Sequence, residues 1–236
     1  MMIRKGNRYR VVADGAIATA HYHKIKDFTE QEHEIPLTTL ATLASLFVKH
    51  QVHNHFGISL LHRHQDTNIG SVMVHSKLQI LDQEVDICQA KTFDSRLFHA
   101  CSYFLDEDMG FLPYEYSTED HGASAECLFL DELACFLLEN KLQTVLALCC
   151  ASKSISPWFE YSIPDNSGTI AVQNPLQVQL DLVEAEWNFH PLKDTITITT
   201  VKRCDKVASG AHTRPDDSII ALFKEAVRSC GSPSVF

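Results

Sequence analysis

Segments with a β-type pattern are numerous in this sequence, and they do not alternate regularly with helical ones. Apolar residues recur at the helical spacing of three and four in residues 36–50 and 128–142, and in a last segment that begins at residue 215. Short apolar or alternating runs predict strands at residues 58–64, 71–81, 84–90, 97–105, 144–151, 158–163, 169–173, 178–189 and 194–202. This order predicts an α+β fold, with about three main helices packed on a largely antiparallel or mixed β-sheet.

Three segments have weaker patterns. Residues 9–20 contain enough apolar residues for one strand, and residues 21–24 are typical of a surface turn. Residues 111–116 are apolar, but Pro113 cannot donate a ladder hydrogen bond. We therefore expect that segment to be an edge strand or a shaped loop.

Composition favours one globular domain. The 236 residues are 45% hydrophobic and 21% charged, which is sufficient for a packed core and ordinary for a folded chain. No internal repeat, low-complexity block or Pro/Gly/Ser-rich linker is visible. We expect a single domain over residues 1–236, with loose termini at residues 1–8 and 231–236.

Charge and cysteine usage exclude several classes of protein. The formal charge of −10 disfavours binding to nucleic acid. No apolar run approaches the ~20 residues of a membrane span, and no secretory signal is visible. The eight cysteines form no Cys-x-x-Cys pair, which favours reduced thiols and a cytoplasmic protein. The oligomeric state cannot be read from these patterns.

Histidines are concentrated around one predicted strand. Five of the 13 histidines fall between His50 and His64, where chance predicts about 0.8. If residues 58–64 are extended, His62 and His64 continue the face of Ile58 and Leu60, and the intervening arginine faces the other way. Two histidines on an otherwise apolar face make this strand the best candidate for a functional site.

A pair of histidines two residues apart suits two kinds of chemistry. One is acid–base catalysis near neutral pH, with His62 and His64 as the catalytic residues. The other is a divalent transition metal, for which the candidate ligands are His53, His55, His62 and His64. His75, His99, Glu115 or His190 would be further ligands if neighbouring strands supply them. Hydrogen-bonded structural histidines are the third interpretation.

Other motifs carry less weight. His64 and Asp66 match the start of a two-histidine, one-carboxylate iron site, but chance predicts about 1.7 such pairs in this composition. The fingerprints of nucleotide-binding loops, zinc proteases and serine hydrolases are absent. Cys149 and Cys150 lie in an apolar run, which predicts inert thiols.

Two short motifs resemble those of a known group of proteins. They are Leu60-Leu61-His62-Arg63-His64 and Pro113-Tyr114-Glu115-Tyr116. Similar segments occur in little-characterised filamentous-fungal proteins, some of which look like members of biosynthetic gene clusters. In those proteins an aromatic residue usually follows the first motif, where this chain has Gln65. The resemblance spans roughly residues 35–200 and implies small-molecule chemistry without a cofactor.

The leading hypothesis is therefore an enzyme of fungal specialised metabolism: a cofactor-independent cyclase, isomerase or lyase with an apolar pocket. His62 and His64 would polarise an apolar substrate or move a proton. The candidate substrate-binding residues are Leu60, Tyr114, Glu115, Trp187 and His190. Two alternatives stay open: a metalloprotein that uses the same histidines, and a non-catalytic binding or accessory protein.

Overall fold

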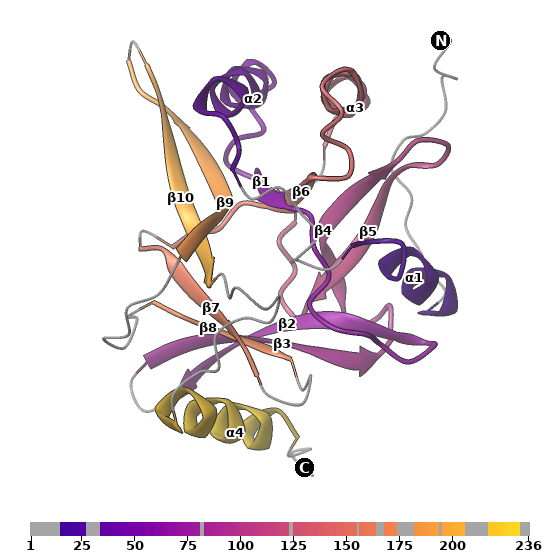
Figure 1. Cartoon of the computed structure of the whole chain (residues 1–236), viewed down its shortest axis with the longest axis vertical. Helices are drawn as coiled ribbons and strands as arrows, with labels where there is room; N and C mark the ends of the chain where they lie inside the picture. The colour runs from indigo at the N-terminus through magenta and orange to yellow at the C-terminus, as the bar shows by residue number, and fades with distance from the viewer. Residues whose placement is uncertain are drawn as a thin grey trace.

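Ten β-strands form a closed barrel in a computed structural model of the chain (Figure 1). The structure describes residues 15–26, 34–80, 83–122, 125–154, 156–163, 168–173, 182–193, 195–205 and 217–231. Around the barrel the strand order is β1-β6-β4-β5-β2-β3-β8-β7-β10-β9, and β9 pairs with β1 to close it. The strands are β1 (Phe56–Leu60), β2 (Ser71–Ile80), β3 (Gln83–Thr92), β4 (His99–Asp106), β5 (Gly110–Ser117), β6 (Leu146–Cys150), β7 (Trp158–Ser162), β8 (Thr169–Val172), β9 (Leu182–Pro191) and β10 (Ile196–Asp205).

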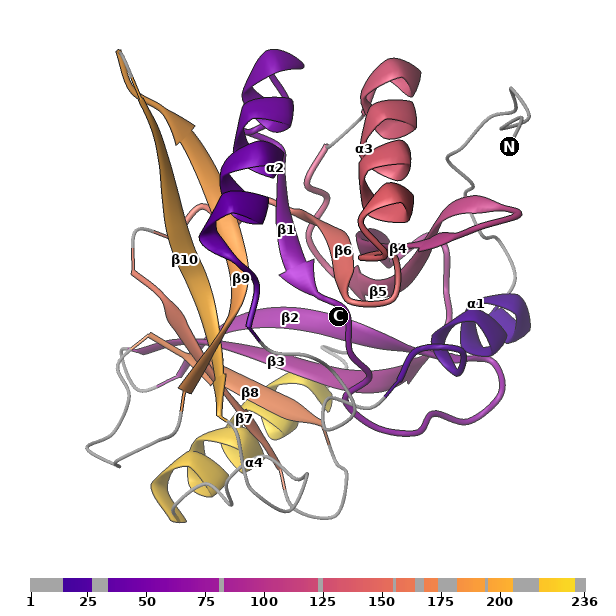
Figure 2. The same ribbon diagram turned by 45° about the horizontal axis from the view of Figure 1, so that its top comes forward.

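Four helices of the described chain cover the outside of the barrel. They are α1 (Gly15–Tyr22), α2 (Leu37–Lys49), α3 (Cys127–Glu139) and α4 (Asp217–Gly231). Helices α2 and α3 lie side by side over β1 and β6, and α4 lies across the opposite side of the barrel (Figures 1 and 2). The largest core cluster, which includes Phe47, Phe129 and Phe189, fills the space beneath α2 and α3.

The chain consists of two halves with the same order of elements. Residues 37–117 form α2 followed by five strands, and residues 127–205 form α3 followed by five strands. Both helices have 13 residues and both following strands have five. Each helix ends in a turn with one non-glycine residue at positive φ, Gln51 in the first half and Lys141 in the second. A shift of 90 residues superimposes these segments in sequence.

Strand pairing repeats with the same symmetry. The parallel pair β2–β5 aligns Met73 with Glu115, and the parallel pair β7–β10 aligns Trp158 with Lys202. Irregularities interrupt β4–β5 at Ser102 and β9–β10 at Lys202, which are matching places in the two ladders. The halves are also interlocked, because β1 pairs only with β6 and β9, and β6 pairs only with β1 and β4.

The expected fold class is therefore wrong. The structure is a mostly β, closed barrel of mixed pairing, rather than an α+β sheet with three helices packed on it. Alternation within a strand shows which residues share a face, but it does not show whether the first and last strands of a sheet meet. Pro113 illustrates the error: it lies in β5, a strand paired on both sides with β4 and β2, beside the irregularity in the β4 ladder.

The expectation of no internal repeat is also wrong at the level of structure. Between α2–β1 and α3–β6 only Leu40, Leu43 and Ala44 recur as the same residue, at positions 130, 133 and 134. The two segments share a pattern of buried positions rather than residue identities, so the duplication leaves little trace in the sequence.

The start of the chain also differs from expectation. Residues 9–14 of the predicted strand lie outside the described residues, and the rest of that segment belongs to the helix α1. Residues 21–24 were expected at the surface, yet the side chain of Tyr22 is fully buried. The two segments that we expected to be loose, residues 1–8 and 231–236, lie almost wholly outside the described part of the chain.

Candidate functional site

A cavity of about 120 Å³ lies inside the barrel and opens to solvent. Its wall combines apolar side chains with many ionisable ones drawn from both halves of the chain. The ionisable groups of the interior are His62, His64, His75, Asp86, Glu115, Glu186 and Lys202, and Lys77, Glu119, His121 and Lys153 also line the cavity. Glu160, from β7, lies next to His62 and His64.

The segment that carries the two histidines is not a strand. β1 ends at Leu60, and the following residues are held by single hydrogen bonds to neighbouring elements. The Leu61 amide donates to the Val145 carbonyl (2.8 Å), and the His64 amide donates to the Tyr22 hydroxyl (3.0 Å). The predicted shared face is found only in part: Leu60, His62 and His64 line the cavity, whereas Ile58 packs in the core beneath α2 and α3.

Hydrogen bonds fix the tautomers of both imidazoles. His62 Nδ1 lies 3.0 Å from the Leu60 carbonyl oxygen, which only accepts, so Nδ1 carries the proton and Nε2 carries the lone pair. His64 Nε2 lies 3.0 Å from Glu115 Oε1. Burial raises the pKa of Glu115, but its close contacts with His64 and His75 hold that pKa well below its usual value. The ionised carboxylate accepts from His64 Nε2–H, so in the neutral ring the lone pair is on Nδ1.

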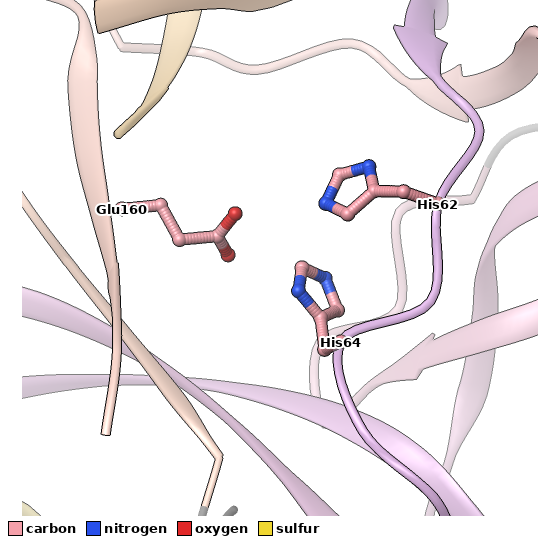
Figure 3. A group of neighbouring side chains, drawn as sticks. All are labelled: His62, His64 and Glu160. Atoms are coloured by element: carbon pink, nitrogen blue, oxygen red, sulfur yellow. The ribbon is translucent and has the colours of Figure 1, made fainter. Parts of the chain in front are cut away.

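The two rings share one carboxylate neighbour. Nitrogens of His62 and His64 and a carboxylate oxygen of Glu160 lie within 4.8 Å of one another. Figure 3 shows the Glu160 carboxylate directed at both imidazoles from the other side of the cavity. His64 Nδ1 is buried and makes no hydrogen bond to any residue that the structure describes.

Glu160 is itself held in place. Its Oε1 accepts from the Thr169 hydroxyl at 3.0 Å, and its Oε2 accepts from the Cys204 thiol at 3.1 Å. The Lys202 ammonium lies 3.8 Å from Glu160 Oε1 and 3.9 Å from Glu186 Oε2. Both distances exceed hydrogen-bond length, so Lys202 is paired with these carboxylates through charge alone.

Glu115, the partner of His64, continues into a network whose contacts are shorter than those of Lys202. Glu115 Oε2 is 3.6 Å from His75 Nε2, and His75 Nδ1 is 3.1 Å from Asp86 Oδ2. Burial lowers the pKa of His75, but its acidic neighbours, among them the Asp86 carboxylate at 3.1 Å, raise it well above its usual value. Because burial raises the pKa of Cys88 to about 11, the thiol is neutral near pH 7 and the carboxylates retain the proton on His75.

The structure brings together some of the predicted site residues and separates others. His62, His64, Leu60, Tyr114 and Glu115 all line the cavity. Trp187 is buried in the core beneath α2, and His190 is exposed on β9. His53 and His55 come just before the first residue of β1, whereas His62 comes just after its last residue. The two pairs of histidines are therefore at different ends of the strand. Asp66 is mostly exposed and pairs with Arg63 at 3.0 Å.

Glu160, Lys202, Asp86 and Glu186 were not predicted. Glu160 stands in the run Trp158-Phe159-Glu160-Tyr161, where an acid between aromatic residues signals a charge that needs a buried partner. No comparable signal marks Lys202, which follows a strand of β-branched residues. These side chains come together only because the second half of the chain closes the barrel.

No protein-family model, curated protein or solved structure matches this chain. Among the described residues, none of the helices combines the length and the apolar character that crossing a bilayer requires.

Proposed function

We propose that this protein is a metal-dependent enzyme acting on small molecules, with a divalent transition metal ion held by His62, His64 and Glu160. One observation carries the proposal: one nitrogen of each imidazole has a fixed acceptor, and a nitrogen of each ring lies within 4.8 Å of a Glu160 carboxylate oxygen. Metal-binding histidines characteristically donate their second nitrogen to a carbonyl or a carboxylate in this way.

The charges of the interior support a cation at this place. The buried carboxylates of Glu115 and Glu160 and the partly buried ones of Asp86 and Glu186 outnumber the cationic groups of His75 and Lys202. Buried charges are costly unless they are compensated. A divalent ion beside Glu160 offsets the excess.

The ligand set indicates a catalytic rather than a structural ion. Two imidazoles and one carboxylate suit Fe²⁺, Zn²⁺, Mn²⁺ or Co²⁺, and three protein ligands leave coordination positions for a substrate. An ion held there would supply Lewis-acid polarisation of a substrate oxygen. Glu115 keeps His64 in the binding tautomer, and Thr169 and Cys204 orient Glu160.

Equilibrium dialysis of untagged, chelator-treated protein against Co²⁺, Zn²⁺ and anaerobic Fe²⁺ tests the proposal. We expect one equivalent of bound metal and visible absorption bands for the Co²⁺ form. His62→Ala, His64→Ala and Glu160→Gln should each weaken binding by about 100-fold or more, since each removes a ligand. The double variant His53→Ala/His55→Ala is the matched control and should bind like the wild type.

Circular dichroism of each variant separates a lost ligand from a lost fold. The proposal fails if the folded wild type takes up no metal, or if the His53/His55 variant loses as much affinity as the others.

The pairing of His64 with Glu115 also favours a second candidate, the cofactor-independent cyclase, isomerase or lyase. A carboxylate that orients an imidazole 3.0 Å away makes His64 a base with Nδ1 toward the cavity. Its test is hydrogen–deuterium exchange at the α-carbon of small carbonyl compounds, followed by NMR with metal-free protein. Exchange that His64→Ala abolishes would support this candidate, and absence of exchange would contradict it.

Three sequence-based expectations stay predictions: the kinship with filamentous-fungal biosynthetic proteins, the apolar substrate and the cytoplasmic location. The motif residues of that resemblance, His62, His64 and Glu115, do meet at one cavity.

A further inference from the structure

We propose that Lys202 binds the carboxylate of a small organic acid in the cavity beside His62, His64 and Glu160. The inference rests on the proposed function, because the metal ion provides the positive charge that allows a second anion to enter. It adds a substrate class and names the residue that recognises it.

The position of Lys202 is the first argument. Its side chain lines the cavity and is 17% exposed, although its strand belongs to the closed barrel. Its ammonium lies 3.8 Å from Glu160, one of the three residues that would hold the ion. An ammonium has three donors, and its contacts to Glu160 and Glu186 are longer than hydrogen bonds. A ligand oxygen near both Lys202 and the metal site would satisfy those donors.

The entrance of the cavity is the second argument. Two more lysines, Lys77 and Lys153, line the same cavity in a chain whose formal charge is −10. Both lysines are exposed, as is Glu119, an acidic lining residue 3.5 Å from Lys77. Local positive charge in an acidic protein attracts anionic ligands.

The charge balance after metal binding is the third argument. The carboxylates of Asp86, Glu115, Glu160 and Glu186 face His75, Lys202 and a divalent ion. The ion offsets the excess of carboxylates, so a monocarboxylate that enters beside Lys202 meets no surplus of negative charge.

The cavity volume limits the size of the ligand. An apolar cavity of ~150 Å³ holds benzene, so about 120 Å³ encloses roughly half a dozen non-hydrogen atoms. Because the cavity opens to solvent, a longer molecule would place its acid group inside and extend through the opening.

Acetate and acetamide are a matched pair of probes, equal in size and different in charge. We expect acetate to change the visible spectrum of the Co²⁺-loaded protein with a saturable Kd, and acetamide to have little effect. Lys202→Met should weaken acetate binding by at least about tenfold, which is a loss of roughly 1.4 kcal/mol. Lys202→Arg keeps the charge and should retain most of the affinity. Lys49→Met is the control, because Lys49 pairs with Glu132 outside the cavity, and it should change the Kd by less than about threefold.

Metal uptake is measured first, so the two proposals can fail separately. Lys202→Met should bind Co²⁺ at least as well as the wild type, because it removes a cation that competes for Glu160. Equal acetate affinity in wild type and Lys202→Met, or equal binding of acetate and acetamide, would overturn the inference. If no variant takes up Co²⁺, the proposed function fails. The inference then fails as well, because without the ion nothing offsets the carboxylates around Lys202.

Discussion

The two halves of the barrel have matching backbones and different interior chemistry. Strand pairing makes His75 equivalent to Glu160, Asp86 to Thr169, and Glu115 to Lys202. The first half contributes a chain of close charged contacts, at 3.0 to 3.6 Å, from His64 through Glu115 and His75 to Asp86. The second half contributes a carboxylate and an ammonium at 3.8 Å. The first half therefore orients the proposed metal ligand His64. The second half supplies the proposed metal ligand Glu160 and the ammonium of Lys202, which makes no hydrogen bond to either carboxylate beside it.

The largest expected difference between the halves is at the equivalent pair Glu115 and Lys202. Glu115→Ala should destabilise the metal-free protein by about 3–5 kcal/mol, because it leaves the positive charge of His75 with one buried partner fewer. Lys202→Met should cost less, between the ~1 kcal/mol of an exposed ion pair and the ~3 kcal/mol of a buried one. Urea unfolding of both variants provides the comparison. A larger loss for Lys202→Met would reverse our assignment of the tighter half.

A second comparison concerns the first strand of each half. Gly57 of β1 corresponds to the fully buried Ala147 of β6. A Cβ at position 57 would lie 2.7 Å from the Trp187 carbonyl oxygen and 2.8 Å from Asn188 Oδ1. Gly57→Ala should therefore destabilise the protein by about 1–3 kcal/mol. Ala147→Gly should also destabilise it, by about 1 kcal/mol, since a packed methyl group is lost. Unchanged stability of Gly57→Ala would show that β1 and β9 separate easily.

The smallest expected effect is a dependence on pH that comes from His75 in the first half. The folded pKa of His75 is raised, so its stabilisation is complete below its unfolded pKa of about 6.5 and is lost as pH rises through the folded value. Each pH unit between the unfolded and the folded pKa of His75 changes the free energy of unfolding by about 1.4 kcal/mol. Urea midpoints of the wild type should fall between pH 6 and 9, and those of His75→Gln should stay flatter. Parallel profiles would mean that His75 is not the group responsible.

The same network weakens in acid for the opposite reason. The pKa values of Glu115 and Asp86 are lowered, so their stabilisation is present above the unfolded values near pH 4 and is lost as pH falls through the folded ones. The first-half network is therefore complete from about pH 4.5 to 6.5.

Local patterns in the sequence predicted much of the secondary structure but not the architecture. Helices α2 and α3 and most strands follow from apolar spacing, as Leu40, Leu43 and Phe47 illustrate. Closure of the barrel depends on pairs such as Ser59 with Glu186, which are distant in sequence and show no local pattern. The duplication was missed because the halves conserve burial rather than residue identity.

The candidate site shows the same division. His62, His64 and Glu115 could be named from the sequence, since clustered histidines and a carboxylate in an apolar motif are unusual. Glu160 and Lys202 could not, because their partners come from the other half of the chain. Trp187 and His190 were plausible for their chemistry, yet the β9 register places Trp187 in the core and leaves His190 exposed.

The exchange of β1 and β6 between the halves has a consequence during synthesis on the ribosome. Both partners of β1 belong to the second half, so β1 emerges long before any strand can pair with it. Unpaired strand edges bind other chains and lead to aggregation. Incomplete products that stop before α3 should therefore depend on chaperones, whereas two separately made halves should recognise each other, because each carries the strand that the other lacks.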